Sequence, residues 1–345
     1  MKIKEKYSDE RRTEIVNVSG EVTTEDLIPN EKRVITFTKL GYIKNHDIDS
    51  YNVQRRGGKG LSGMSRREDD VAEKILIASN HDYLMFFTNL GRVYRIKCFE
   101  IPESSRTAKG LNIVNLISLG ENEKVTSLLR VSNEEESNYI VMVTKRGIIK
   151  RCLLSDFSNV RKNGVAAIKL WENDELRWVE VTDGNKFIFI ATKNGKANRF
   201  EENKISIMGK QAHGVKAIKF KGDDEVVGFI PVSENDKILT ISETGFAKIT
   251  DVSEYPTHSR ASVGVINYHT SKYGKVAAVL TVELDKDIMA ISSNGMIIRF
   301  PASSISEVSR SGKGVKAMRL PEGTVVVSAT TVDHQNENDE NGENL

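Results

Sequence analysis

The feature that most constrains this chain is an internal repeat of about fifty residues, which occurs six times. Each copy contains an apolar run, then Thr or Ser, two residues and a glycine. These first glycines are Gly41, Gly91, Gly147, Gly195, Gly245 and Gly295. A second glycine follows 19 residues later, or 17 in the third copy, at Gly60, Gly110, Gly164, Gly214, Gly264 and Gly314. Such a period indicates an array of like units that bury their apolar faces against one another.

Each unit predicts four β-strands. The apolar run and the residues after the first glycine form a β-hairpin, as in 83–96, because glycine supplies the positive φ of a short turn. A third strand starts at the second glycine, as in 214–220, and a fourth precedes the hairpin, as in 123–129. Four strands per unit are typical of a propeller blade, so the sequence predicts an all-β, six-bladed disc.

The fourth kind of strand determines how the disc closes. It begins near Val71, Val125, Trp178, Val226, Val276 and Val325. The last copy has no hairpin after it, and the first hairpin, at Ile35–Lys44, has no clear strand of this kind before it. We therefore predict that Val325–Ala329 completes the first blade, so that the chain ends meet and no long sheet edge stays open.

Composition divides the chain into three parts. Residues 1–34 are expected to form a short helical segment and a linker, residues 35–332 the disc, and residues 333–345 a disordered acidic tail. The disc segment carries 43 basic and 35 acidic residues, and the tail five acids and no base. A basic body is compatible with a polyanionic partner. No run approaches the roughly 18 apolar residues of a membrane span, so we expect a cytoplasmic protein that does not enter membranes.

Positive charge recurs at equivalent positions of the units. Four residues before the second glycine stand Arg56, Arg106, Lys210, Arg260 and Arg310, and the third copy has Arg161 and Lys162 beside this position. Three or four residues after the first glycine stand Lys44, Arg95, Lys150, Arg199, Lys248 and Arg299. Further candidates are Lys109 and Lys313. Equivalent positions of a ring share one rim, so these residues predict a belt that binds phosphates. The alternative is that Lys and Arg simply populate exposed loops.

We find no sequence motif that is typical of an enzyme or of a metal site. The sequence has no GxxxxGK[ST], HExxH or GxSxG motif, and its six histidines lack ligand spacing. The two cysteines are far apart, which indicates neither disulfides nor a thiolate metal site. We therefore expect no catalytic residue, cofactor or metal in this chain.

One loop resembles a known family motif. The residues Gln54, Arg55, Arg56, Gly57, Gly58, Lys59 and Gly60 are similar to the box that marks the C-terminal domain of the bacterial DNA gyrase A subunit. Residues 9–14 resemble the segment by which that subunit leaves its breakage-reunion domain, and residues 25–29 the start of its wrapping domain. The resemblance covers essentially residues 5–332. It implies a six-bladed β-pinwheel that wraps double-stranded DNA around its perimeter with positive handedness, and so presents a segment for ATP-driven negative supercoiling.

The resemblance also implies partners and roles. In the family the strand-cutting tyrosine lies in another domain, and ATP and Mg²⁺ are expected on the B subunit, so we expect no topoisomerase activity from this chain alone. The full-length A subunit would form a dimer that assembles with B subunits in the nucleoid, while the isolated domain is expected to be a monomer. Three glycines of the box would let backbone N–H groups approach phosphates, beside Arg55, Arg56 and Lys59. We expect the box to lie where the belt closes.

Two rival functions remain open. The wrapping domain of topoisomerase IV has similar blades but lacks an intact box, so the complete heptad favours gyrase. A propeller that serves as a protein-interaction scaffold would show a repeated Trp-Asp or Gly-Gly signature, and neither recurs. The acidic tail is expected either to be a solvated end or to compete with DNA for the basic rim.

Overall fold

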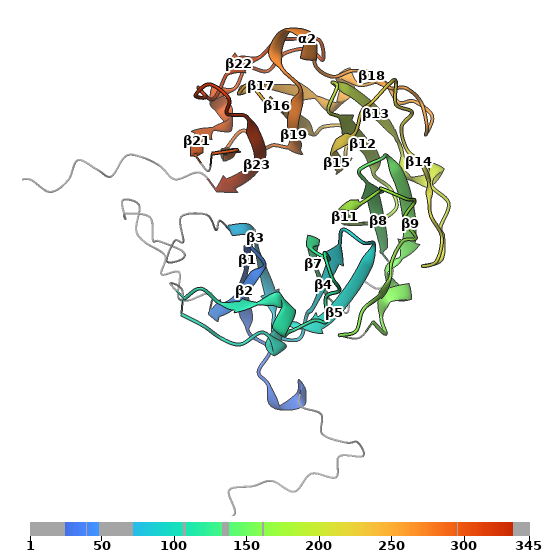
Figure 1. Ribbon diagram of the computed structural model, residues 1–345, viewed down its shortest axis with the longest axis vertical. Coiled ribbons are helices and arrows are strands. Elements are labelled where there is room, and N and C mark those ends of the chain that lie inside the picture. Colours follow the sequence, from blue (N-terminus) through green and yellow to red (C-terminus); the bar gives the residue numbers. More distant parts are fainter. Residues whose placement is uncertain are drawn as a thin grey trace, which may run out of the picture.

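Six β-sheets follow one another around a central opening (Figure 1). This computed structural model describes residues 25–38, 40–47, 72–105, 108–132, 138–160, 162–294 and 296–333. Five sheets have four strands and the sixth has three. We number these blades 1 to 6 in chain order. The prediction of an all-β, six-bladed disc is confirmed.

Each blade is built on a hairpin that the Thr/Ser-x-x-Gly sequence closes. In blade 2 the backbone N–H of Gly91 donates to the Thr88 carbonyl at 2.9 Å, and the N–H of Arg92 donates to the Thr88 hydroxyl at 3.3 Å. Gly91 has a φ of +72°, which favours glycine. The hairpins are β1 (Lys32–Thr38) with β2 (Tyr42–Asp47), β4 (Tyr83–Thr88) with β5 (Arg92–Lys97), β8 (Tyr139–Thr144) with β9 (Ile148–Leu153), β12 (Phe187–Thr192) with β13 (Lys196–Glu201), β16 (Lys237–Ser242) with β17 (Phe246–Asp251), and β20 (Lys286–Ser292) with β21 (Ile297–Pro301).

A long strand follows each hairpin and pairs antiparallel with its first strand, on the side of the central opening (Figure 1). These strands are β3 (Ala72–Ser79), β7 (Val125–Val131), β11 (Leu176–Thr182), β15 (Val226–Val232), β19 (Val276–Thr281) and β23 (Val326–Asp333). The prediction that Val325–Ala329 completes the first blade is therefore wrong, because β23 pairs with β20 in blade 6. A long strand lies between two hairpins in the sequence, and the apolar pattern does not say which of them it joins.

The outer strand of a blade comes from the next unit of the chain. From Gly110 onward, the two residues after each second glycine pair with the hairpin of the preceding blade, as β14 does with β9. These short strands are β6 (Leu111–Asn112), β10 (Val165–Ala166), β14 (Val215–Lys216), β18 (Val265–Ile266) and β22 (Val315–Lys316). A Cβ at Gly314 would collide with the Ala247 carbonyl oxygen, which explains the second glycine. Among the described residues no strand fills this outer position in blade 6, and no strand pairing joins blade 6 to blade 1.

The core consists of apolar layers between neighbouring blades. Three equivalent residues of each hairpin face the next blade, and in blades 1 to 5 all of them are buried: Ile35, Phe37 and Ile43; Met85, Phe87 and Val93; Val141, Val143 and Ile149; Phe189, Ala191 and Ala197; Leu239, Ile241 and Ala247. In blade 6 the equivalents are Met289, Ile291 and Ile297, of which Ile297 is 37% exposed. Blade 6 therefore has the least covered apolar face of the ring.

Short helical turns occupy the connections. They are η1 (Glu25–Leu27), η3 (Cys98–Glu100), η4 (Ile113–Asn115), η6 (Leu154–Phe157), η7 (Glu202–Lys204), η8 (Val252–Glu254), α2 (Thr270–Tyr273) and η9 (Ala302–Ser304). Residues 1–24, for which a helical segment and part of the linker were predicted, lie outside the described residues, as do residues 334–345 of the acidic tail. Within the described part of the chain, no helix has the length and apolar character to cross a bilayer.

Candidate nucleic-acid interface

The outer edge of the ring carries one loop from each of the second to sixth units. We call the segments that precede the second glycines rim loops, namely residues 102–110, 158–164, 206–214, 256–264 and 306–314. Four of them bridge the second hairpin strand of a blade: Glu103 pairs with Asn45, Ile207 with Arg151, Thr257 with Arg199 and Glu307 with Ile249. The rim loops are therefore fixed to the blades at equivalent places, and so are the side chains that they carry.

Three of the predicted basic residues in rim loops stand four residues before the second glycine, with their side chains partly exposed: Lys210, Arg260 and Arg310. Arg260 donates from Nη1 to the Lys216 carbonyl at 2.7 Å, and Arg310 donates from Nη1 to the Ile266 carbonyl, also at 2.7 Å. Each arginine thus binds the outer strand of the preceding blade in the same way. Because a guanidinium has five N–H donors, this contact orients the group and leaves other donors for a phosphate.

Three further predicted residues, Lys109, Lys162 and Lys313, lie at other positions of the rim loops. Lys109 places its amino group 3.8 Å from the centroid of the Tyr42 ring, and Lys313 lies 5.1 Å from that of Phe246. Lys162 pairs with Glu100 at 2.6 Å, a contact that would compete with DNA. The heptad 54–60, Arg106 and Arg161 lie outside the described residues.

Four of the six basic residues that follow the first glycine are buried. The prediction of direct DNA contact is wrong for these four, because the structure buries the side chains of Lys44, Lys150, Lys248 and Arg199. The lysines stand three residues after the glycine and Arg199 four residues after it, so their side chains point to opposite faces of the strand. Neighbouring elements cover both faces. The Arg199 guanidinium lies 4.1 Å from the centroid of the Phe187 ring and donates to the Tyr255 carbonyl at 3.1 Å.

The remaining two residues of this group are also engaged within their blades. The Arg95 guanidinium stacks 3.3 Å from the centroid of the Tyr83 ring. Arg299 donates from Nε to Asp287 at 2.7 Å. Both side chains keep some exposed surface, so their contact with DNA stays a prediction.

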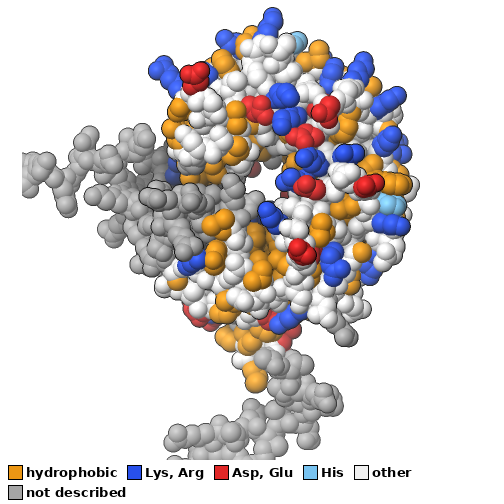
Figure 2. Space-filling model, in the orientation of Figure 1, with side chains coloured by type: hydrophobic (Ala, Val, Ile, Leu, Met, Phe, Trp, Pro, Cys, Tyr) orange, Lys and Arg blue, Asp and Glu red, His pale blue; other side chains and the backbone are white. Residues whose placement is uncertain are grey.

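Sequence reasoning missed other exposed cations at this edge. They stand two or five residues after a second glycine: Lys169, Lys216, Lys219, Lys316 and Arg319. The signal was present, because these residues also repeat at fixed offsets from the same glycine. Figure 2 shows Lys and Arg side chains at intervals along the outer edge at the top and right of the ring, while acidic groups gather closer to the central opening.

An aromatic pair accompanies these cations. The Trp171 and His213 rings stack with centroids 4.1 Å apart and an interplanar angle of 17°, and Trp171 is 58% exposed. The backbone N–H of Lys169 donates to the Ala212 carbonyl at 3.1 Å, which joins the two segments that carry the rings. An exposed indole beside lysines offers an apolar plane that a sugar or base can contact.

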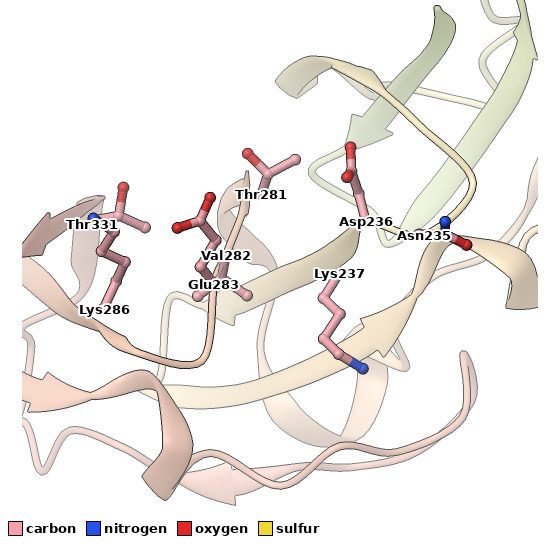
Figure 3. Close-up of a pocket in the computed structure, with 8 residues that line it drawn as sticks. All are labelled: Asn235, Asp236, Lys237, Thr281, Val282, Glu283, Lys286 and Thr331. Carbon is pink, nitrogen blue, oxygen red and sulfur yellow. The ribbon is translucent and has the colours of Figure 1, made fainter.

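Two observations concern metal ligands and thiols in the described part of the chain. No cluster of three or more His, Cys, Asp or Glu there could hold a metal ion. Burial raises the pKa of Cys98 to about 12 and that of Cys152 to about 11, so neither thiol is a ready nucleophile. Figure 3 shows an open groove between blades 5 and 6, which is lined in part by Lys237, Glu283 and Lys286. The Lys237 amino group also pairs with Asp251 at 2.8 Å and with Glu307 at 2.5 Å.

Comparison with known families identifies the array. The sequence matches the family described as "DNA gyrase C-terminal domain, beta-propeller" over residues 32–79, 82–132, 138–183, 186–233, 236–283 and 286–333. The chain belongs to this family. Each matched segment contains one hairpin and the long strand after it, which is how the structure divides the blades of this gyrase domain.

Individual relatives agree with the family. The chain is 40% identical over 342 residues to the DNA gyrase A subunit of Staphylococcus epidermidis, covering 97% of this chain and 38% of that protein. It is 39% identical over 336 residues to the DNA gyrase A subunit of Haloquadratum walsbyi, covering 95% and 39%. The chain thus spans less than half of the length of these curated relatives.

Solved structures show the same fold. The C-terminal domain of a DNA gyrase A protein superposes with a TM-score of 0.68 at 28% identity, covering 87% of this chain and 99% of that one. The C-terminal domain of a DNA topoisomerase IV superposes with a TM-score of 0.78 at 24% identity, covering 89% and 94%. The second likeness concerns the fold alone.

Proposed function

We propose that this domain binds double-stranded DNA without sequence preference and bends it around the outer edge of the ring, in a wrap of positive handedness. The observation that carries the proposal is the repetition of Lys210, Arg260 and Arg310 four residues before a second glycine. Each donates to a backbone carbonyl, Lys210 to that of Asp156 in η6 and the two arginines to the outer strand of the preceding blade. Phosphates are spaced regularly and carry no base information, so a repeated cation suits them.

The energy of bending explains why several blades are needed. Bending about 40 base pairs through a half circle costs on the order of 10 kcal/mol for an elastic rod with the persistence length of DNA. A single loop with one or two charged contacts does not offset this cost. Cations on consecutive blades do, and the neighbouring Lys169, Lys216, Lys219, Lys316 and Arg319 enlarge the surface.

The heptad 54–60 extends the proposal to the junction of blades 1 and 6. Gly60 is the first of the second glycines, and after the later ones the chain pairs with the preceding blade. The blade that precedes the first in a ring is the sixth, whose hairpin has no outer strand among the described residues. We propose that the heptad both binds DNA and lies where the belt closes.

The proposal includes a partner complex. The relatives are named as A subunits of DNA gyrase and are longer than this chain. We propose that the domain acts within a gyrase of A and B subunits in the cytoplasm, at the nucleoid. There the wrapped segment would enter ATP-dependent strand passage, with ATP and Mg²⁺ on the B subunit, and the domain itself would supply no catalytic group.

A ligation experiment tests the handedness of the wrap. The domain is bound to nicked circular DNA, the nick is sealed, and the sign of the trapped supercoils is read on a gel. We expect positive supercoils. Supercoils of negative sign, or none at saturating protein, would contradict the wrap, and the latter result would favour the scaffold alternative.

Rim variants test where the DNA runs. We expect the triple variant Lys210→Ala, Arg260→Ala, Arg310→Ala to flatten the dependence of log affinity on log salt by about 0.9 per lost phosphate contact. The matched control is Lys193→Ala at a hairpin turn, whose amino group pairs with Glu225 at 3.1 Å. Equal slopes in the triple variant and the wild type would place the DNA elsewhere.

A further inference from the structure

Three buried lysines lie directly beneath the rim loops. Lys44, Lys150 and Lys248 occupy the same position in blades 1, 3 and 5, three residues after the first glycine, and their side chains have almost no exposed surface. Each donates from Nζ to a rim-loop carbonyl: Lys44 to Ala108 at 3.5 Å, Lys150 to Lys210 at 2.7 Å, and Lys248 to Arg310 at 2.5 Å. The carbonyls of Lys210 and Arg310 belong to the residues whose side chains form the rim.

Holding the loop does not by itself require a charge. In blade 4 the equivalent residue is Asn198, whose amide donates to the Ser259 carbonyl at 3.3 Å. Ser259 stands in its rim loop where Ser309 stands in the next, and Lys248 reaches the Ser309 carbonyl at 3.4 Å. A neutral amide therefore makes the same contact, although burial of an ammonium costs several kcal/mol. The repeated ammonium groups need another explanation.

We infer that Lys44, Lys150 and Lys248 are positioning residues of the DNA-binding rim, which hold the rim loops from beneath and add positive potential where a phosphate binds. The inference rests on the proposed function. A buried charge is screened by little solvent, so it acts on a phosphate above the loop more strongly than an exposed lysine at the same distance. In the free domain the charge is a cost, and a bound phosphate offsets it.

The surroundings of Lys248 make this coupling measurable. The pKa of Lys248 is lowered to about 8, mainly because the ammonium is buried and in smaller part because the Arg310 guanidinium of the rim loop lies near it, while Glu254 on η8 opposes the shift. The Tyr268 ring, with its centroid 5.7 Å from Nζ, completes the environment. A phosphate bound at Arg310 would oppose the first two effects. DNA binding is therefore expected to favour the charged lysine, and affinity to fall as the lysine loses its proton.

The test compares DNA affinity of the full chain at about pH 7.5 and about pH 9.5, on either side of the pKa of Lys248 but below that of ordinary lysines. We expect Lys248→Met to bind a linear duplex about tenfold more weakly than wild type at the lower pH, the equivalent of one charged hydrogen bond. At the higher pH the two affinities should differ by less than about threefold. In an Arg310→Ala background the effect of Lys248→Met should shrink, because the two residues act on the same phosphate.

Matched variants separate position from charge. Asn198→Met removes a neutral contact to the equivalent carbonyl, so its effect should be the same at both pH values. Lys248→Asn copies the residue of blade 4 and should show the pH-dependent loss of Lys248→Met, which keeps the test valid if the methionine variant does not fold. Thermal melting at both pH values checks the fold of each variant.

Two results would overturn the inference. One is a Lys248→Met variant that binds as tightly as wild type at the lower pH, and the other is a loss of equal size at both pH values, which indicates structure without charge. A wild-type chain whose DNA affinity does not depend on salt would instead refute the proposed function.

Discussion

Two neighbouring basic residues of β9, Lys150 and Arg151, point to opposite faces of the sheet and contact different partners. Lys150 sends its amino group to the Ala167 and Lys210 carbonyls, both at 2.7 Å, and so joins two consecutive segments of the outer edge. Arg151 points to the other face of the sheet, where its guanidinium lies 4.7 Å from the centroid of the Tyr139 ring. The same guanidinium lies 3.6 Å from the Glu202 carboxylate of blade 4. The alternation of side chains along a β-strand thus directs the two cations of a basic pair to different partners.

The shifted pKa of Lys248 predicts how stability depends on pH. Its value of about 8 lies below the ordinary 10.5, so between these values the unfolded chain binds a proton that the folded domain does not. The free energy of unfolding therefore rises with pH in that window. From about pH 7.5 to about pH 9.5 we expect wild type to gain about 1 to 2 kcal/mol relative to Lys248→Met. Urea denaturation of both proteins measures this, and a constant difference would contradict the shift.

The sequence predicted where positive charges recur, but not which of these side chains are buried. The offsets from a first glycine locate Lys44, Lys150 and Lys248 correctly within the repeat. Their burial depends on which elements cover each face of a blade, and here the rim loop of the next unit lies over these lysines. The Trp171–His213 stack likewise joins two units and has no signal in either one.

At the scale of elements, the outer strand of each blade depends on one glycine. Gly314 has a φ of +78°, and a side chain there would meet the Ala247 carbonyl of β17, with which β22 pairs. Gly323 has a similar φ of +76° but no atom within 4 Å of a Cβ. A comparison of alanine substitutions at the two glycines therefore distinguishes the cost of backbone strain from the cost of a steric collision.

We expect Gly323→Ala to lower the free energy of unfolding by about 1 to 2 kcal/mol, the cost of a left-handed conformation. Gly314→Ala should cost clearly more, about 3 kcal/mol or above, because strain and the loss of the β22 pairing add. Urea denaturation of the two variants makes the comparison. Equal costs would mean that the close approach at Gly314 relaxes without penalty.

The strand content of a unit was predictable, whereas the assignment of strands to blades was not. Apolar alternation and the paired glycines mark every hairpin and every outer strand. The blade that receives an outer strand is set by contacts between units, such as Val215 of β14 opposite Ile149 of β9. The same contacts explain why β23 belongs to blade 6 rather than to blade 1.

The whole ring has one interface unlike the others. Ile149 of blade 3 is fully buried by blade 4, whereas its equivalent Ile297 in blade 6 is 37% exposed. In blade 2 the face toward the preceding blade carries Phe86 and Ile96, and the equivalent residues of blade 1 are Thr36 and His46. The junction of blades 6 and 1 thus combines a partly exposed apolar face on blade 6 with polar residues on blade 1. Blade 5 carries Thr240 and Thr250 at the same two positions, but there the facing residues of blade 4 are fully buried.

Paired substitutions measure this difference. We expect Ile149→Ala to lower the free energy of unfolding by about 3 to 4 kcal/mol, and Ile297→Ala by about 1 kcal/mol or less, because little of the second side chain is removed from solvent. Denaturation midpoints and slopes of both variants provide the values. Similar losses would show that Ile297 is packed in solution as tightly as Ile149.

The exchange of outer strands between units also determines how this domain can be divided. A fragment that ends at residue 233, after the fourth long strand, would lack β18 and leave the hairpin of blade 4 with an open edge. The same fragment extended to residue 266 would contain that strand. Boundaries for shortened versions should therefore be placed after a short outer strand, one partial unit beyond the last blade that is to be kept.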